Sequence, residues 1–107
     1  MTIYVSLPIT GHDLEEQKRL AEKARERLME LDEESQVVTP FDVADYVEAM
    51  NPKAEYADYM AADIAFIIKD ADTVCFLVHP IFTRSKGVRL EYFTAKLYGK
   101  KIKIMRP

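Results

Sequence analysis

Short apolar runs alternate with helical patterns along the chain, and this alternation limits the possible folds more than any other feature. The runs are TIYVSL, SQVVTP, DTVCFLV and KKIKIM, at residues 2–7, 35–40, 72–78 and 100–105. Their β-branched and apolar residues and their lengths are typical of strands. Strands that are separated by helices need crossover connections, which place the strands parallel in one sheet. We therefore expect a mostly parallel, four-stranded sheet.

Three segments carry the helical repeat that would cover this sheet. They are residues 14–31, residues 55–69, and a segment that begins at Ser85 and ends at Gly99, a residue suited to a helix C-terminus. The intervening stretch with Asp42, Asp45 and Asn51-Pro52 is polar, and we expect an irregular loop there. This order predicts an α/β fold, a flavodoxin-like three-layer sandwich, formed by residues 1–107 as a single domain.

Charge and composition limit the kinds of molecule that this chain is expected to bind and the compartment in which it is expected to work. A formal net charge of −3 and a pI near 5.4 argue against a nucleic acid polymer as the main partner. No apolar run is long enough to span a membrane, and the first ten residues lack the features of a signal peptide. The single Cys75 lies in an apolar strand, which suits a reducing, cytoplasmic compartment. The two histidines lack metal-ligand spacing, so we expect no metal and no cofactor.

Two carboxylates occupy positions that the helical repeat assigns to the packed side. Glu91 shares a face with Val88, Tyr92 and Ala95, and Asp63 lies within the apolar stripe of its own helix. Burial removes hydration that a charged group needs, so each carboxylate requires compensation. An ion pair or a backbone cap is one explanation for each. Paired carboxylates in a partly dry site are also typical of acid and nucleophile roles, and this functional interpretation gains weight because both occur in one small domain.

The loops after the predicted strands should border a ligand site, because parallel sheets bind ligands beyond the carboxyl ends of their strands. Ser6 and Gly11 in the first of these loops, and His79, Ser85 and Gly87 in the third, are candidate substrate-binding residues. Ser85 and Gly87 lie where a helix begins, and free N–H groups there favour an anion such as phosphate. An ordinary N-cap at Ser85 and a turn-holding role for His79 are the alternatives.

Three stretches carry a family resemblance that covers nearly the whole chain. IYVSLPITG, DIAFIIKDADTV and the pattern Ser85-x-Gly87-x-x-x-Glu91 resemble the nucleoside 2-deoxyribosyltransferase-like superfamily, especially its small members and the related 2'-deoxynucleoside 5'-phosphate N-glycosidases. The resemblance implies that Glu91 is the nucleophile that attacks C1' of a deoxyribose. It also implies that Tyr4 positions the nucleophile or the sugar, that Asp63 contacts the base or protonates it, and that Ser85 binds a 5'-phosphate.

The expected function is therefore cleavage or transfer at the N-glycosidic bond of a small deoxynucleoside or deoxynucleotide. A nucleotide-binding or sensor module that kept the site without turnover is the alternative. A Glu91 carboxylate open in a cleft and within reach of Tyr4 would favour catalysis. An ion pair between Glu91 and Arg84 or Arg89 would favour the non-catalytic role. Because relatives of this kind build sites at subunit contacts, we also expect a homodimer or a larger homo-oligomer.

Overall fold

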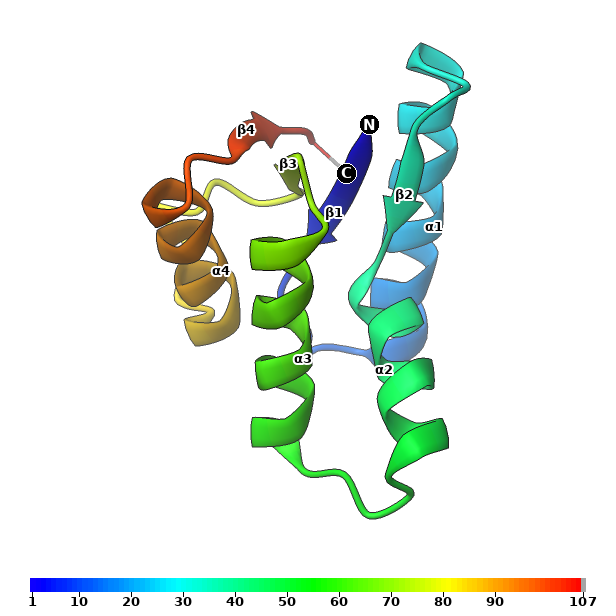
Figure 1. Ribbon diagram of the computed structural model, residues 1–107, viewed down its shortest axis with the longest axis vertical. Coiled ribbons are helices and arrows are strands. Elements are labelled where there is room, and N and C mark those ends of the chain that lie inside the picture. The colour runs from blue at the N-terminus through cyan, green and yellow to red at the C-terminus, as the bar shows by residue number, and fades with distance from the viewer. Residues whose placement is uncertain (107) are drawn as a thin grey trace.

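A computed structural model describes residues 1–106 of the chain and contains a four-stranded sheet with four helices (Figure 1). In chain order the elements are β1 Thr2–Ser6, α1 Leu14–Leu31, β2 Gln36–Val38, α2 Pro40–Met50, α3 Tyr56–Lys69, β3 Thr73–Phe76, α4 Lys86–Leu97 and β4 Lys101–Ile104. The strand order is β2-β1-β3-β4, and every neighbouring pair is parallel. The predicted flavodoxin-like α/β architecture with a four-stranded sheet is confirmed. None of the helices in residues 1–106 has the length and apolar character needed to cross a membrane.

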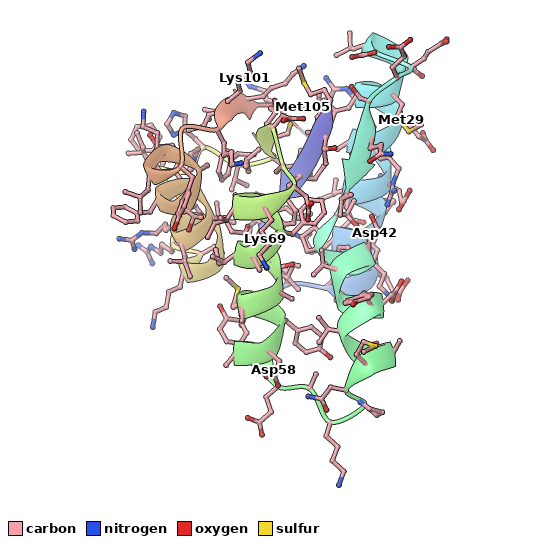
Figure 2. The ribbon with its side chains drawn as sticks, viewed as in Figure 1. Met29, Asp42, Asp58, Lys69, Lys101 and Met105 are labelled. Atoms are coloured by element: carbon pink, nitrogen blue, oxygen red, sulfur yellow. The ribbon has the colours of Figure 1, made fainter. Side chains whose placement is uncertain are left out.

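Two apolar cores lie on opposite faces of the sheet, because successive residues of a strand point to opposite sides. On one face Ile3 and Val5 of β1 pack with Ala24 and Leu28 of α1, and Met105, which follows β4, joins this core (Figure 2). The other face is covered by α2, α3 and α4. Its core contains the strand residues Tyr4, Val74 and Phe76 and the helix residues Val43, Val47, Ile67, Val88 and Ala95. Figure 1 shows α3 between α2 and α4.

The prediction of an irregular loop after β2 is wrong over most of that segment, because residues 40–50 form α2. Pro40 occupies the first turn, where a missing N–H costs nothing. Thr39 and Asp42 form a capping box in which each side chain accepts a hydrogen bond from the other residue's backbone N–H. Val43 and Val47, one turn apart, are buried against the sheet. The proline and the aspartate therefore mark a helix start, and only a short connection, residues 51–55, separates α2 from α3.

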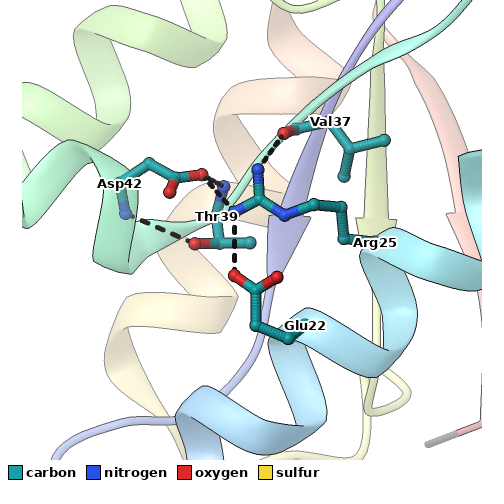
Figure 3. A network of polar contacts seen from close by, with 5 residues as sticks. All are labelled: Glu22, Arg25, Val37, Thr39 and Asp42. Atoms are coloured by element: carbon teal, nitrogen blue, oxygen red, sulfur yellow. Dashed lines mark hydrogen bonds and ion pairs between the residues drawn. The ribbon is translucent and has the colours of Figure 1, made fainter.

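Arg25 of α1 ties this helix start to the rest of the fold (Figure 3). Its guanidinium donates to the backbone oxygen of Val37 at 3.0 Å, to Asp42 at 2.7 Å and to Glu22 at 3.0 Å. Asp42 accepts from Arg25 with the same oxygen, Oδ2, that accepts from the backbone N–H of Thr39. The network holds α1, the end of β2 and the start of α2 together. It lies at the carboxyl end of β2, the side of the sheet where ligand sites form in such folds.

Candidate active site

Two hydroxyl groups of β1 hold the carboxyl group of Glu91. The Tyr4 hydroxyl donates to Oε2 at 2.9 Å, and the Ser6 hydroxyl donates to Oε1 at 2.7 Å. Tyr4 and Ser6 are two residues apart in the strand, so both side chains project from the same face of the sheet. Both are fully buried, and Glu91 is 4% exposed. Each carboxyl oxygen therefore has its own hydroxyl donor inside the protein.

The position at which α4 begins sets the inward direction of the Glu91 side chain. Ser85 caps the helix, with its hydroxyl oxygen accepting from the backbone N–H of Val88 at 3.3 Å. From that cap, helical spacing places Val88, Glu91 and Ala95 on the face that packs against the sheet. Val88 and Ala95 are apolar, and both are almost completely buried. Glu91 is thus the charged member of the buried face of α4, which also contains Val88, Thr94 and Ala95, as the sequence predicts.

Asp63 of α3 is the second buried carboxyl group of this region, and it is 7% exposed. Its Oδ1 is buried and has no hydrogen-bond partner among the described residues. An orphaned carboxyl oxygen is costly in a core, and such atoms are uncommon in folded proteins. The Tyr4 hydroxyl donates to Glu91 at 2.9 Å, and the Tyr4 ring packs on the ring of Phe66, which lies one helical turn from Asp63 on α3, with 5.9 Å between the ring centroids. The three side chains therefore form one cluster.

The electrostatics of the cluster favour retained protons. Burial is the largest effect and raises the pKa of Glu91 to about 8. The hydrogen bonds that Ser6 and Tyr4 donate lower this pKa, and the nearby Asp63 charge raises it. Burial also raises the pKa of Asp63 to about 7, with the Tyr4 hydroxyl acting in the opposite direction. The pKa of Tyr4 lies well above its usual value, through burial and then the two nearby carboxylates. Near neutral pH the pair can hold one proton between them, so that one carboxyl group is an acid while the other is ionised.

No cation compensates these carboxyl groups in the described part of the chain. All ion pairs within residues 1–106 join side chains between Glu15 and Asp42, and none involves Glu91 or Asp63. The ion pair with Arg84 or Arg89 that would have given Glu91 a purely structural role is not formed. Nor do residues 1–106 contain a cluster of three or more His, Cys, Asp or Glu side chains that could hold a metal ion.

Glu91 is within reach of Tyr4, as expected for a catalytic residue, but it is buried and does not lie open in a cleft. A hollow of about 590 Å³ lies beside α4 and is lined by Pro80, Ile81, Lys86, Arg89, Leu90, Tyr92 and Phe93. None of the cluster residues lines it. α3 packs against the start of α4 here: a Cβ at Gly87 would be in ordinary van der Waals contact with α3, 3.5 Å from the Met60 sulfur and 3.7 Å from the Tyr56 hydroxyl. The N-terminal ends of α3 and α4 therefore pack closely beside the cluster.

The remaining candidates lie in the loops. His79 is exposed; its Nδ1 accepts from the backbone N–H of Ile81 at 3.3 Å, and its ring packs on Phe82 at 4.6 Å. Gly11 is exposed and has a φ of +82°, which suits the turn that follows β1. Ser85 is half-buried and forms the helix cap.

The structure therefore brings Tyr4, Ser6, Asp63 and Glu91 together and leaves Gly11 and His79 at the surface. Sequence reasoning named Ser6 as a substrate contact and missed its bond to Glu91. The spacing of Tyr4 and Ser6 on one strand face was the available signal.

Comparison with known proteins places the chain in one family without assigning an activity. Residues 1–104 match the family model described as a domain of unknown function, DUF4406. No curated protein matches the chain, and no solved structure does.

Proposed function

The chain belongs to the DUF4406 family, and we propose that it breaks the N-glycosidic bond of a 2'-deoxynucleoside or its 5'-monophosphate through a covalent glycosyl intermediate on Glu91. The observation that carries the proposal is the pair of hydroxyl donors, Tyr4 and Ser6, on the two carboxyl oxygens of Glu91. Such donors fix the direction of a carboxyl group and favour its ionised form. The resemblance to the nucleoside 2-deoxyribosyltransferase-like superfamily supports the same role for Glu91.

The two carboxyl groups divide the chemistry. In the first step a Glu91 oxygen attacks C1', the C1'–N bond breaks, and its electron pair moves to the base nitrogen, which takes a proton from Asp63. In the second step water attacks C1' and releases Glu91, while Asp63 recovers a proton from the water. A second base in place of water would give transfer. The scheme follows retaining glycoside hydrolysis, and it needs Glu91 ionised while Asp63 is protonated. In the closed site the pKa values of about 8 for Glu91 and about 7 for Asp63 favour the reverse distribution, so the proposal requires the proton to move from Glu91 to Asp63 when the site opens and substrate binds.

Tyr4 and Ser6 act as positioning residues in this scheme. As the negative charge of Glu91 passes through the leaving base to Asp63, which gives the base its proton, the two hydroxyl groups keep the attacking oxygen in line. Preorganised donors of this kind are effective because they need no reorganisation during the reaction. The burial of Glu91 supplies the dry surroundings in which these interactions are strongest.

The substrate class follows from the start of α4. Ser85 lies between Arg84 and Lys86, both exposed, and the helix N-terminus attracts negative charge. A 5'-phosphate bound there would place a nucleotide beside the helix that carries Glu91. Monophosphates are therefore preferred over free nucleosides in this proposal.

The alternative is a nucleotide-binding or sensor module without turnover, and the closure of the site favours it. At 4% exposure Glu91 cannot contact a sugar unless the covering segments separate. Under this alternative a deoxynucleotide would bind near Ser85 and stay intact.

Incubation with a panel of deoxynucleosides and deoxynucleoside 5'-monophosphates, followed by chromatography for released base, tests the proposal. We expect base release by the wild type, none by Glu91→Gln, and wild-type release by Glu30→Gln, a matched change at an exposed glutamate of α1. Binding of a monophosphate without release would support the sensor alternative. Neither binding nor release across the panel would refute both.

A further inference from the structure

The hollow beside α4 is separate from the Glu91 cluster, and we call it the α4 hollow. Its walls come from α4 and from the segment that follows β3, and they include Arg89, Phe93 and Ile81. Arg89 and Phe93 each lie two positions from Glu91, so they point in nearly the opposite direction from the helix. In Figure 1, α3 lies on one side of α4, and the other side has no neighbouring helix among the described residues. The volume of about 590 Å³ falls in the range of about 300–1,000 Å³ that is typical of small-molecule sites.

Two cationic side chains, Lys86 and Arg89, line the α4 hollow. They are three positions apart on α4, which makes them neighbours on the helix surface. Neither forms an ion pair within the described residues. The one acidic residue between His79 and Tyr98 is Glu91, which is buried and faces the sheet. A phosphate group suits two adjacent free cations, because it carries up to two negative charges and three acceptor oxygens.

Large apolar side chains surround these cations and are open to solvent. Ile81, Leu90 and Phe93 are 63%, 46% and 66% exposed. A single exposed apolar residue needs no explanation, but several around one hollow are typical of a binding surface. The Phe93 ring stacks on no other aromatic ring of the described residues, whereas Tyr92 is fixed by an edge contact with Phe76. Phe93 can therefore stack on the planar ring of a ligand.

We propose that the α4 hollow is a second ligand site, which binds a planar aromatic ring that carries a phosphate group, the chemical class of the nucleoside monophosphates. Lys86 and Arg89 hold the phosphate, and the ring stacks on Phe93 and contacts Leu90. Because Glu91 points away from the hollow, a molecule bound there cannot reach the nucleophile and stays intact. The site therefore goes beyond the proposed reaction and does not depend on it.

Other ligands satisfy fewer of these observations. An aliphatic carboxylate would contact the apolar side chains, but it would leave Phe93 without a stacking partner and bring a single charge to two cations. An uncharged aromatic molecule would leave Lys86 and Arg89 unpaired. A nucleic acid strand needs a basic groove that follows several phosphates, whereas the hollow has two cations. A small aromatic phosphate matches both the charge and the apolar wall.

Titration of the ¹⁵N-labelled full chain with adenosine 5'-monophosphate, followed by NMR, tests the site. This probe is a ribonucleotide and lies outside the 2'-deoxy class of the proposed reaction. We expect the largest saturable changes at the amides of Ile81, Arg89 and Phe93. Adenosine and inorganic phosphate should each bind at least about tenfold more weakly, because each lacks one half of the ligand. No saturable change at millimolar probe, changes confined to the surroundings of Tyr4 and Glu91, or equal affinity for adenosine or phosphate would overturn the proposal.

Variants on α4 separate this site from the candidate active site. Arg89→Gln and Phe93→Ala should each raise the dissociation constant of the same probe about tenfold. Lys96→Gln and Leu97→Ala are the matched controls, because both residues are exposed on α4 and neither lines the hollow; they should bind as the wild type does. Circular dichroism checks that all four variants are folded. Wild-type affinity in both hollow variants, with weaker binding only in Ser85→Ala, would place the nucleotide at the proposed substrate site and overturn this inference alone. Absence of base release with binding at the hollow intact would overturn the proposed reaction alone.

Discussion

Replacing Glu91 with glutamine should make the protein more stable near neutral pH and slightly less stable in acid. In the folded protein burial raises the pKa of Glu91 from 4.5 to about 8. Between these values the folded state holds a proton that the unfolded chain releases, so the free energy of unfolding falls as pH rises, by about 1.4 kcal/mol per pH unit. From about pH 5 to pH 7 this amounts to about 3 kcal/mol. Glutamine does not ionise, so the variant lacks this loss.

The substitution also has a cost that does not depend on pH. Tyr4 and Ser6 each donate to one carboxyl oxygen, and the amide nitrogen of glutamine cannot accept from one of them. Losing one such hydrogen bond costs about 1 kcal/mol. The variant should therefore be less stable than wild type by about 1 kcal/mol near pH 5 and more stable by about 2 kcal/mol near pH 7.

Urea unfolding at these two pH values, followed by circular dichroism, measures the difference. Glu30→Gln, at an exposed position of α1, is the control and should leave the free energy of unfolding within about 0.5 kcal/mol of wild type at both pH values. A Glu91→Gln protein that is less stable by about 3 kcal/mol or more at both pH values would show that Glu91 is an ionised member of a structural network. That result would refute the reasoning from burial.

Two further expectations concern the site. Ser6→Ala removes one donor to Glu91 and should lower kcat for base release about 100-fold, with a much smaller effect on KM, as for the loss of a preorganised donor; an unchanged kcat would remove Ser6 from the mechanism. Deoxynucleoside 5'-monophosphates should raise the midpoint of thermal unfolding more than the matching nucleosides do, and Ser85→Ala should reduce this difference; equal protection by both ligand classes would count against a phosphate site at the start of α4.

The fold could be predicted because its elements have clear periods in the sequence. The predicted strand at residues 72–78, which contains β3, includes a continuous apolar run at residues 74–78, and the helix at residues 14–31 separates an apolar stripe from a charged side. α2 was missed because Pro40 and Asp42 also occur in turns, and only the capping contacts with Thr39 distinguish a helix start. Local sequence patterns do not contain that distinction.

The site could be predicted in part. The helical repeat was enough to place Glu91 and Asp63 on buried faces, since it depends on spacing alone. The bond from Ser6 to Glu91 joins residues that are 85 positions apart, so it depends on how α4 packs on β1. The closure beside Gly87 likewise depends on Tyr56 and Met60 of α3. Contacts of this kind come from tertiary packing, which no single segment of the sequence reveals.

The central claim, that Glu91 is a nucleophile, is tested most directly by looking for the sugar on the protein. The wild type is mixed with a deoxynucleoside 5'-monophosphate, quenched in acid within milliseconds, and examined by intact-mass and peptide mass spectrometry. The account predicts a fraction of chains heavier by one deoxyribosyl phosphate, with the added mass on Glu91 and absent from Glu91→Gln. Base release by the wild type with no labelled protein at any quench time, or with the label on another residue, would contradict it.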